Sequence, residues 1–498
     1  MRRAAEVLAL LAAAGIAPRG IAADSRRVGA GEVFVAWPGA LSDGRRYVDS
    51  ALGRGAAAVL YESGDGFSLP AANRPVFAVE GLRTLAGHLA HEIYGHPSEK
   101  LWLAGVTGTN GKTTVSQWLA RALEALGERC GVIGTLGSGF PDALAAGLNT
   151  TPDALDLHRL LAGFVRDGAR AATLEVSSIG LDQERVNGAR FALAIFTNLT
   201  RDHLDYHGSM QAYAAAKARL FDLPWLEAVV MNLDDDFGFD MAALLAARGM
   251  KVIAYTLSAG RAAALPGVRA LVGANPRASL AGTAFELEWE GRRETLDVRL
   301  AGAFNISNLL AVIGALLARG TPLEEALRVA RTLTPPPGRM QLAGGEGEPL
   351  VIVDYAHTPD ALAKVLEAAR GSAGLRGGRL VCVFGCGGER DAGKRPQMGK
   401  LARRLADRAI VTSDNPRGED PGRIIADIIA GAGPDTESVS DRAAAIRAAV
   451  DEADADDVVV IAGKGHEPYQ EIHGVKYPFS DIEQAGQALA ARRERVAS

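Results

Sequence analysis

Short apolar runs alternate with amphipathic stretches through most of the chain, and this alternation constrains the fold more than any other feature. The runs LWLAGV, AATLEV, FALAIFTN, EAVVMN and KVIAYT each precede a loop and an amphipathic stretch. The alternation resumes further on with LVIVDY, RLVCVFG, RAIVTSD and DVVVIAGKG. Strands that alternate with helices form mostly parallel sheets covered by helices. The sequence therefore predicts an α/β protein with two such sheets, the second of them doubly wound.

Two connectors divide the chain into three predicted domains, which suits its length of 498 residues. The polar segment YGHPSEK follows a small α/β part with the strand candidates EVFVAW and AAAVLYE. The prolines of LTPPPGRMQ can neither continue a helix nor pair in a central strand. We therefore expect domains at 1–98, 99–334 and 335–498. In the second, AFELEWEGRRETLDVRL predicts a hairpin and NISNLLAVIGALLARG a helix that ends at Gly320.

The charge pattern argues against nucleic-acid and membrane partners. The formal net charge is -5, and the positive residues are scattered through helical stretches, so no basic face is expected. No apolar segment approaches the roughly 20 residues that span a bilayer. The N-terminal run resembles a secretory signal, but Glu6 interrupts it, and Val7, Leu8 and Leu11 fall on one helical face. We expect small-molecule chemistry in the cytoplasm, with a monomer as the working expectation.

The cysteines indicate a reducing compartment. Cys130, Cys382 and Cys386 are too few for a disulfide framework. Cys382 and Cys386 are spaced like metal ligands, but one such pair without a second is a weak signal. We interpret all of them as structural or incidental.

The segment GVTGTNGKTT, from Gly105 to Thr114, predicts a nucleotide-binding loop of unusual spacing. Val106 stands where the standard G-x-x-x-x-G-K-[ST] loop has its first glycine. A strand candidate precedes the segment and a helical pattern follows Lys112, so backbone N–H groups, a helix N-terminus and one ammonium meet there. A glycine-rich turn with an exposed lysine is the alternative.

GTNGKTT resembles the nucleotide loop of the Mur ligases and of the related folylpolyglutamate synthetases. Further segments occur in the order typical of Mur ligases, and with DSR and GRRYV near the start they extend the resemblance over nearly the whole chain: NTTPD, LEVSSIGLDQERV, TNLTRDHLDYHG, AAAKARLF, FNISNLL, PPGRM, VDYAHTPDAL, GCGGERDAGKRPQMG, DNPR and GKGHEPYQ. The resemblance implies a UDP-binding N-terminal domain, a central P-loop-type ATP-binding domain and a Rossmann-like C-terminal domain that binds an amino acid.

The resemblance also implies a reaction. ATP would phosphorylate the D-glutamyl carboxylate of UDP-N-acetylmuramoyl-L-alanyl-D-glutamate, and the amine of meso-2,6-diaminopimelate would displace phosphate. This reaction belongs to peptidoglycan precursor synthesis, and so to cell-wall biogenesis, cell shape and cell division. A ligase of the same family that adds another residue is one alternative. A nucleotide-hydrolysing switch is the other, although a switch needs no amino-acid pocket.

Several residues are implied in phosphoryl transfer. Lys112 would hold the β- and γ-phosphates, and Thr113, Glu175 and His203 would lie at Mg²⁺. The matched context of Lys217 is where the family carries a carbamylated lysine; a solvated helix lysine is the alternative. His203 and His207 have the spacing of a zinc pair, but Leu204 replaces the glutamate of zinc peptidases. The remaining ATP contacts implied by the family are Gly108, Thr109, Asn110, Gly111, Thr114, Asn308, Arg339 and Asp354.

The family pattern also implies two substrate sites. The muramoyl-dipeptide would meet Asn149, Thr150, Thr151, Ser177, Gln183 and Arg185, and the uridine end would meet Ala23 and Ser25. This sequence departs from the family at Ile179, where histidine is frequent. It also departs at Ala40, Leu41 and Ser42, where a His-Gln-Ala run is frequent.

DNPR resembles the motif of those family members that add diaminopimelate. Arg417 offers a planar fork for a carboxylate, Asp414 and Glu467 can accept from an ammonium, and Asn415 can serve either group. Arg390 in GGERD would take the other carboxylate. Pro416 and Gly463 complete the expected amino-acid site. A simple Asp-Asn-Pro turn is the alternative.

Overall fold

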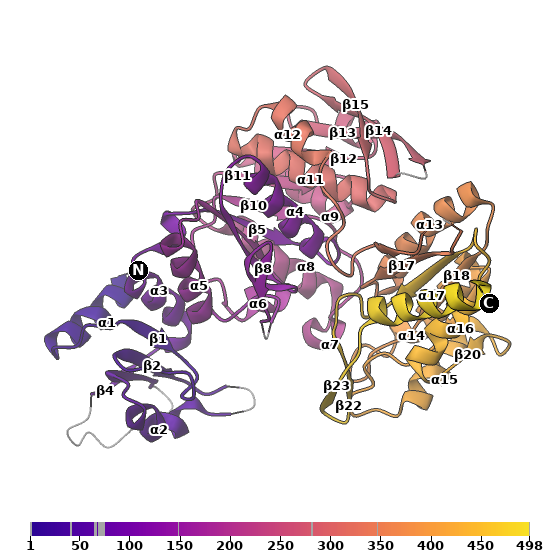
Figure 1. Cartoon of the computed structure of the whole chain (residues 1–498). Coiled ribbons are helices and arrows are strands. Elements are labelled where there is room, and N and C mark those ends of the chain that lie inside the picture. Colours follow the sequence, from indigo (N-terminus) through magenta and orange to yellow (C-terminus); the bar gives the residue numbers. More distant parts are fainter. Residues whose placement is uncertain are drawn as a thin grey trace. The chain divides into compact units, whose positions relative to one another are not determined.

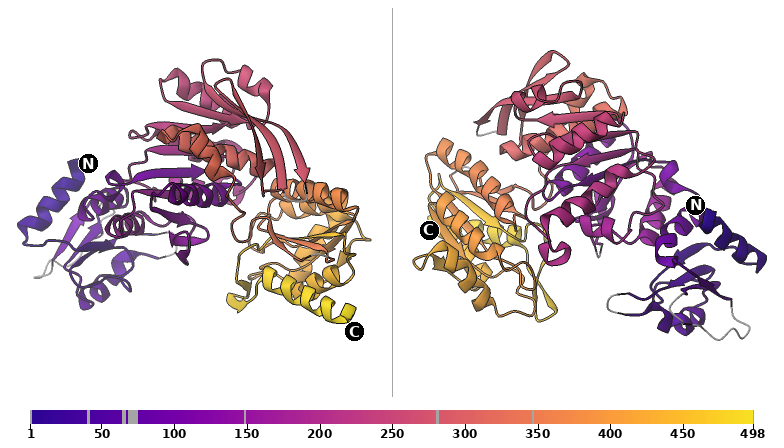
Figure 2. Two further views of the ribbon diagram at one scale, coloured as in Figure 1. Left: turned by 45° about the horizontal axis from the view of Figure 1, so that its top comes forward. Right: turned by 180° about the vertical axis from the view of Figure 1, so that it is seen from behind.

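The structure is a computed structural model that describes residues 2–39, 42–63, 67, 75–147, 149–279, 282–345 and 347–497. Its contacts divide the chain into two compact units. The first unit comprises Met1–Thr107, Leu123–Ile195 and Ala215–Val229. The second unit comprises Gly108–Ala122, Phe196–Ala214 and Val230–Ser498. Figures 1 and 2 show the ribbon from three directions.

The N-terminal part of the first unit is a small parallel sheet between two helical layers. Its strand order is β1 (Gly20–Ala22), β2 (Glu32–Ala36), β3 (Ala58–Glu62) and β4 (Val76–Val79). One face packs against α1 (Arg2–Ala13) and α3 (Leu82–Ile93), and the other against α2 (Val48–Gly53). The predicted first helix is confirmed, because Leu11 is fully buried there and Val7 and Leu8 pack beside it.

A second sheet runs in the order β15-β14-β13-β12-β11-β10-β5-β9-β6-β7-β8. Its strands are β5 (Trp102–Thr107), β6 (Cys130–Gly134), β7 (Gly137–Phe140), β8 (Ala143–Ala145), β9 (Ala171–Glu175), β10 (Leu193–Phe196), β11 (Ala228–Asn232), β12 (Val252–Thr256), β13 (Arg269–Ser279), β14 (Gly282–Trp289) and β15 (Arg292–Val298). β9 pairs in parallel with both β5 and β6. The run of strands expected from the apolar segments is therefore confirmed.

The predicted hairpin is β14 and β15, which pair antiparallel from Thr283↔Val298 to Trp289↔Arg292. Figure 2 shows these long strands at the end of the sheet. Glu290 and Gly291 between them have φ of 49° and 78°. Positive φ at both positions belongs to a type I′ turn, whose twist matches that of the strands.

Helices follow many strands of this sheet along the chain. They include α4 (Lys112–Ala125), α5 (Ala154–Arg166), α6 (Ser178–Asp182), α7 (Leu204–His207), α8 (Met210–Ala218), α9 (Asp236–Ala247), α11 (Ala303–Arg319) and α12 (Leu323–Ala330). α11 ends as predicted, because Gly320 adopts φ 103° and its N–H donates to the carbonyls of Leu316 and Leu317. Such a left-handed residue is the usual stop of a helix.

The C-terminal part of the second unit is a doubly wound sheet, as predicted. Its strand order is β16 (Gln341–Ala343), β17 (Leu350–Asp354), β21 (Val458–Ala462), β18 (Leu380–Phe384), β19 (Arg408–Val411) and β20 (Glu437–Ser438). One face packs against α13 (Pro359–Arg376), α14 (Lys394–Leu405) and α15 (Pro421–Ala432). The other packs against α16 (Arg442–Asp451) and α17 (Asp481–Ala497) (Figure 1).

The register of this sheet brings four loops to one edge. Asp354 pairs with Ala462, Ala462 with Phe384, and Phe384 with Val411. These residues end their parallel strands, so the loops that follow them leave the sheet side by side. The sequence did not predict the edge strand β16 or the hairpin β22 (Tyr469–Ile472) and β23 (Val475–Pro478), which lack long apolar runs.

The cysteines are free and buried. Burial raises the pKa of the Cys382 and Cys386 thiols to about 12, so both stay protonated. The Cys386 sulfur lies 3.6 Å from that of Met398. These cysteines are therefore core residues, as interpreted from the sequence. In the part of the chain that the structure describes, no helix is long and apolar enough to cross a membrane.

Candidate functional site

The glycine loop requires its glycines for steric reasons. Gly108 has φ 147°, and a Cβ there would lie 1.9 Å from Oγ1 of Thr197. Gly111 has φ 87°, and its Cβ would lie 2.5 Å from Oδ1 of Asn308. Only a residue without a side chain leaves room for these neighbours. Asn308, an expected nucleotide contact, thus lies against the loop.

Thr197 and Asn198 hold the loop from the end of β10. The Asn198 carbonyl accepts from the Thr109 N–H at 2.7 Å, and its side-chain oxygen accepts from the Asn110 N–H at 2.9 Å. Thr197 Oγ1 and Asn198 Nδ2 both donate to the Asn110 carbonyl. Neither residue of this pair was predicted to take part in the site. The TNLT segment, which contains both residues, is the sequence feature from which they could have been predicted.

Cationic groups gather where the loop enters α4. Lys112 Nζ donates to the carbonyl oxygens of Gly108 and Thr109 at 2.9 and 2.8 Å. Arg339 Nη2 donates to Thr113 Oγ1 at 3.1 Å, so two expected ATP contacts meet there. Two cationic side chains at a helix N-terminus form a site for a polyanion such as a triphosphate.

Asp354 lies next to this group at the end of β17. Its Oδ2 accepts from the Met340 N–H at 2.8 Å. Burial raises the pKa of the Asp354 carboxyl, and the neighbouring charge of Arg339 opposes that rise. Arg339 in turn lies over the Tyr355 ring, 4.5 Å from its centre.

His203 and His207 flank Tyr213. Their rings lie 6.2 and 5.3 Å from the Tyr213 ring, whose hydroxyl is 3.1 Å from Thr109 Oγ1. Asp202 contacts His203 at 3.5 Å. Burial raises the pKa of the Asp202 carboxyl, but the nearby charges of His357, His203 and Lys394 outweigh it and lower the pKa. Neither histidine belongs to a three-ligand metal cluster among the described residues.

In the first unit, Glu175 is a fully buried carboxylate at the end of β9. Its Oε1 accepts from the Thr135 N–H at 2.9 Å, and its Oε2 from Thr135 Oγ1 at 3.0 Å. Thr135 Oγ1 also lies 3.0 Å from Thr150 Oγ1. The structure thus connects Glu175 to Thr150, which was expected at the dipeptide.

We predict that Gly134→Ala displaces this carboxylate, because the new Cβ would lie 2.1 Å from Glu175 Oε1. Misplacing a group at a reactive centre by about 1 Å can cost roughly 100-fold in rate, so ligation should fall on that order. Gly163→Ala in α5 is the matched control, since a Cβ there would lie 3.5 Å from Arg166 Nη2, at ordinary contact distance. Wild-type turnover in Gly134→Ala would show that Glu175 is not needed in this position.

The other residues expected at the dipeptide form a connected group. Thr151 Oγ1 donates to the Glu175 carbonyl at 2.8 Å and lies 3.0 Å from Ser177 Oγ. Arg185 Nη1 donates to the Thr151 carbonyl at 2.8 Å, and its Nε donates to Gln183 Oε1 at 3.0 Å. These residues meet through the loop before α5 and the turn at α6. Two neighbours lie outside the network: Asn149 is exposed, and the half-buried Ile179 side chain has no polar group.

Lys217 lies in α8 and is 1% exposed. The interpretation of this residue as a solvated helix lysine is therefore wrong. A buried ammonium carries a large desolvation cost, which its surroundings or a change of its chemical form must offset.

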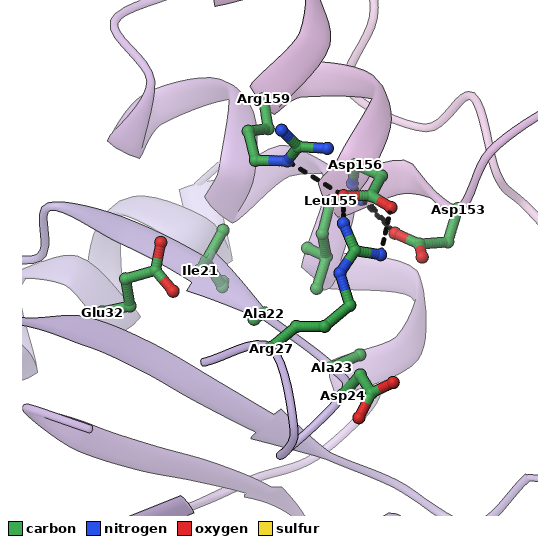
Figure 3. A pocket seen from close by; sticks show the side chains of 10 residues that line it. All are labelled: Ile21, Ala22, Ala23, Asp24, Arg27, Glu32, Asp153, Leu155, Asp156 and Arg159. Carbon is green, nitrogen blue, oxygen red and sulfur yellow. Dashed lines mark hydrogen bonds and ion pairs between the residues drawn. The ribbon is translucent and has the colours of Figure 1, made fainter. Parts of the chain in front are cut away.

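A pocket opens between β1 and the start of α5 (Figure 3). Arg27 pairs with both carboxylate oxygens of Asp156 at 2.8 and 3.0 Å, and Arg159 donates to the same carboxylate at 3.0 Å. The pocket is lined by Ile21, Ala22, Ala23, Asp24, Arg27, Glu32, Asp153, Leu155, Asp156 and Arg159.

Only one of the two residues expected at the uridine lines this pocket. Ala23 lines it, whereas Ser25 is buried and does not. Ala40 and Leu41 lie outside the described residues, and Ser42 Oγ is 3.2 Å from the Tyr47 hydroxyl.

The loops at the edge of the C-terminal sheet bring most of the expected amino-acid site together. Asn415 Nδ2 donates to Glu467 Oε2 at 2.7 Å. A Cβ on Gly463 would lie 2.7 Å from Asp414 Oδ2. Arg417 has φ 51°, and its Nη1 donates to the Gly388 carbonyl at 2.7 Å.

Arg390 and Pro416 lie at the same place. A Cβ on Gly387 would lie 2.9 Å from Arg417 Nη1 and 3.9 Å from Arg390 Cγ. The Pro416 carbonyl would be 2.0 Å from a Cβ on Gly388. The glycines of GCGGERD thus allow this loop to approach DNPR.

Three supporting residues were missed from the sequence. Lys464 donates to Asn415 Oδ1 and to Glu467 Oε2, both at 3.0 Å. Gln470 Nε2 donates to the Asp414 carbonyl at 2.7 Å. Arg442, fully buried, pairs with Asp481 at 2.7 Å and donates to the carbonyl of Ala462 at the end of β21 and to that of Ser413 in the loop after β19.

One cluster in the described residues has metal-like geometry away from these sites, with His91, His96 and Glu99 side by side. His91 Nε2, His96 Nδ1 and Arg190 Nη2 all lie 3.0 Å from the same Glu99 oxygen. Hydrogen bonds and an arginine ion pair thus account for the carboxylate without a metal.

Comparison with known proteins identifies relatives of the whole chain. The Mur ligase family catalytic domain matches residues 18–94, the Mur ligase middle domain 106–316, and the Mur ligase glutamate ligase domain 338–465. A Pseudomonas aeruginosa protein, named UDP-N-acetylmuramoyl-L-alanyl-D-glutamate--2,6-diaminopimelate ligase, is 52% identical over 475 residues, which cover 95% of each chain. A Chromobacterium violaceum protein of the same name is 49% identical and covers 98% of this chain and 97% of its own.

Solved structures agree with these matches. A structure titled as a UDP-N-acetylmuramoyl-L-alanyl-D-glutamate--2,6-diaminopimelate ligase superposes with a TM-score of 0.68 at 38% identity, covering 96% of this chain and 95% of its own. A MurF ligase from Thermotoga maritima, solved in complex with ADP, superposes with a TM-score of 0.66 at 18% identity, covering 96% and 99%. The latter likeness is one of fold.

Proposed function

Because the chain belongs to the Mur ligase family, we propose that it is an ATP-dependent ligase that joins meso-2,6-diaminopimelate to the D-glutamate of UDP-N-acetylmuramoyl-L-alanyl-D-glutamate. The observation that carries this proposal is the 52% identity over 95% of both chains to a relative named for that reaction. The reaction supplies a peptidoglycan precursor, in the cytoplasm and by a monomer.

Substrate binding and catalysis are divided among three domains, at 1–98, 99–334 and 335–498. Family models that end at residue 94, cover 106–316 and begin at 338 support these boundaries. The uridine binds at the pocket in Figure 3, which residues of the first domain form together with the start of α5. Asp24, Glu32, Asp153 and Asp156 outnumber the arginines Arg27 and Arg159 in its lining, which suits the N–H and hydroxyl donors of a nucleoside better than its diphosphate.

The phosphoryl transfer proceeds at the glycine loop. Lys112 and Arg339 hold the β- and γ-phosphates, and the glutamyl carboxylate oxygen attacks the γ-phosphorus, so that ADP leaves and an acyl phosphate forms. Thr113, Glu175 and His203 are the residues that the family pattern implies for Mg²⁺. The oxygen donors of Thr113 and Glu175 suit the ion, whereas imidazole is a more usual ligand of transition metals. The metal would neutralise charge on the transferring group. Thr150, Thr151, Ser177, Gln183 and Arg185 orient the dipeptide.

The amide then forms when the neutral amine of the amino acid attacks the acyl carbonyl and inorganic phosphate leaves. The C-terminal cluster holds the far end of the amino acid. Arg417 and Arg390 take its carboxylates, and Asp414 and Glu467 accept from its distal ammonium. Diaminopimelate has this dipolar far end, whereas L-lysine has the ammonium alone.

A competition between meso-2,6-diaminopimelate and L-lysine tests the substrate. L-lysine lacks the distal carboxylate that Arg417 would bind, which should cost about 2–5 kcal/mol, or roughly 30-fold to several thousand-fold in preference. Mass spectrometry of the product at equal amino-acid concentrations gives the ratio, and Arg417→Ala should reduce it.

Equal incorporation of lysine by the wild-type enzyme would refute the pocket but not the ligase. Phosphate release provides the second measurement. It should require the dipeptide and the amino acid together, and release with ATP alone would indicate a nucleotide switch instead.

A further inference from the structure

Lys464 is a fully buried cation beneath the amino-acid cluster. It follows β21 in GKGHE and is 0% exposed. Its Nζ donates to Asn415 Oδ1 and Glu467 Oε2, each at 3.0 Å, and lies 3.9 Å from Asp414 Oδ1. A buried ammonium is tolerated where anionic partners compensate its lost hydration. Here these partners are two residues expected to bind the substrate ammonium.

The contacts of Lys464 also orient the Asn415 amide. Asn415 Oδ1 faces Lys464 Nζ and the Glu471 N–H, at 3.0 and 2.9 Å. Both groups are donors without acceptor capacity, so the atom facing them must be the amide oxygen. The amide nitrogen therefore points to Glu467, at 2.7 Å. Asn415 thus presents its N–H groups on the side of the pocket that holds Glu467.

Lys464 balances the charge of the cluster as well. Asp414 and Glu467 are two carboxylates, and Lys464 and Arg417 are two cations, so the formal charges cancel. Arg390 and Glu471 add one charge of each sign, and Arg417 Nε lies 3.6 Å from Glu471. A neutral cluster suits a dipolar amino-acid end, which is itself neutral. A cationic end would find no net attraction there.

We propose that Lys464 is a specificity-determining positioning residue, which cancels the charge of the Asp414–Glu467 pair and so makes the pocket select a dipolar over a cationic chain end. This inference rests on the proposed function, because it concerns the same amino-acid site. It goes further in assigning the selection to a fully buried residue that contacts the expected substrate-binding side chains.

The test compares kcat/KM for meso-2,6-diaminopimelate and for L-lysine in Lys464→Met. Without the buried cation the pocket carries a net negative charge, which favours the cationic end of lysine. At an effective dielectric near 20 this predicts that the ratio of the two values falls by about tenfold or more. The change should lie in the KM values of the two amino acids, while kcat at saturation and the KM for ATP stay near wild type.

Lys476→Met is the matched control. Lys464 Nζ lies 5.5 Å and Lys476 Nζ 4.1 Å from the centre of the same Tyr469 ring, but Lys476 is exposed. Its removal changes the net charge of the protein equally and should leave the ratio unchanged. A ratio that fell equally in both variants would assign the effect to the general field and overturn the proposal.

Lys464→Gln separates charge from hydrogen bonding and provides a second variant if Lys464→Met does not fold. Glutamine retains donors towards Asn415 and Glu467 but has no charge, so its ratio should also fall. A wild-type ratio in Lys464→Gln, or an equal loss for both amino acids in either folded variant, would reduce Lys464 to a structural role. Wild-type enzyme that prefers lysine or uses neither amino acid would contradict the proposed function itself, and the inference with it.

Discussion

Lys112→Ala is expected to abolish ATP-dependent ligation and to leave the fold intact. Lys112 is the first residue of α4, and its Nζ donates to the carbonyl oxygens of Gly108 and Thr109 in the loop. It contributes to a phosphate site rather than to a core, so the rate should fall by at least about 100-fold, as when a preorganised group at developing charge is removed. Phosphate release in the presence of all substrates measures it.

Lys251→Ala is the control for this variant. Lys251 Nζ also donates to a backbone carbonyl, that of Ala318 at 2.8 Å, but it is an exposed residue far along the chain from the loop. Thermal unfolding of both variants should match that of wild type. Near-normal turnover of folded Lys112→Ala would contradict the assignment of the loop.

Lys217→Ala is expected to lose most of its ligase activity for a different reason. We propose that Lys217 is carbamylated, because an amine that is 1% exposed can react as the neutral base with carbon dioxide and become an anionic carbamate. Such a carbamate would order a metal between the substrate carboxylate and the phosphate. Acetate should then restore part of the activity of the alanine variant by replacing the missing carboxylate group.

Rescue by acetate distinguishes the loss of a catalytic carboxylate from a loss of folding stability. Lys400→Ala, at an exposed lysine of α14, is the control. Its ligase activity should equal that of wild type and should not change when acetate is added. Carbon-13 NMR after exposure of the wild type to labelled bicarbonate should show a carbamate that Lys217→Ala lacks. Full activity of Lys217→Ala without acetate would leave Lys217 as a buried structural lysine.

Local patterns in the sequence were sufficient to predict the strands with continuous apolar runs, the long helices and the chemistry of single segments. The apolar runs became β5, β9, β10, β11 and β12 because strands covered on both faces need continuous apolar residues. The hairpin formed where Glu290 and Gly291 allow a tight turn. The glycines of the loop stand where any side chain would collide with Thr197 or Asn308. Each of these properties depends on residues close in sequence or on steric limits of the backbone.

Tertiary structure alone decided which of these segments support one another. β21 lies between β17 and β18, so GKGHE meets DNPR although about fifty residues separate them, and Lys464 enters beneath Asn415. Thr197 and Asn198 reach the glycine loop from β10, and Glu175 meets Thr135 across adjacent strands. The burial of Lys217 could likewise not be predicted, because the sequence of its helix suits a solvated lysine. Such contacts follow from strand order and register, which many distant side chains determine together, so no local pattern encodes them.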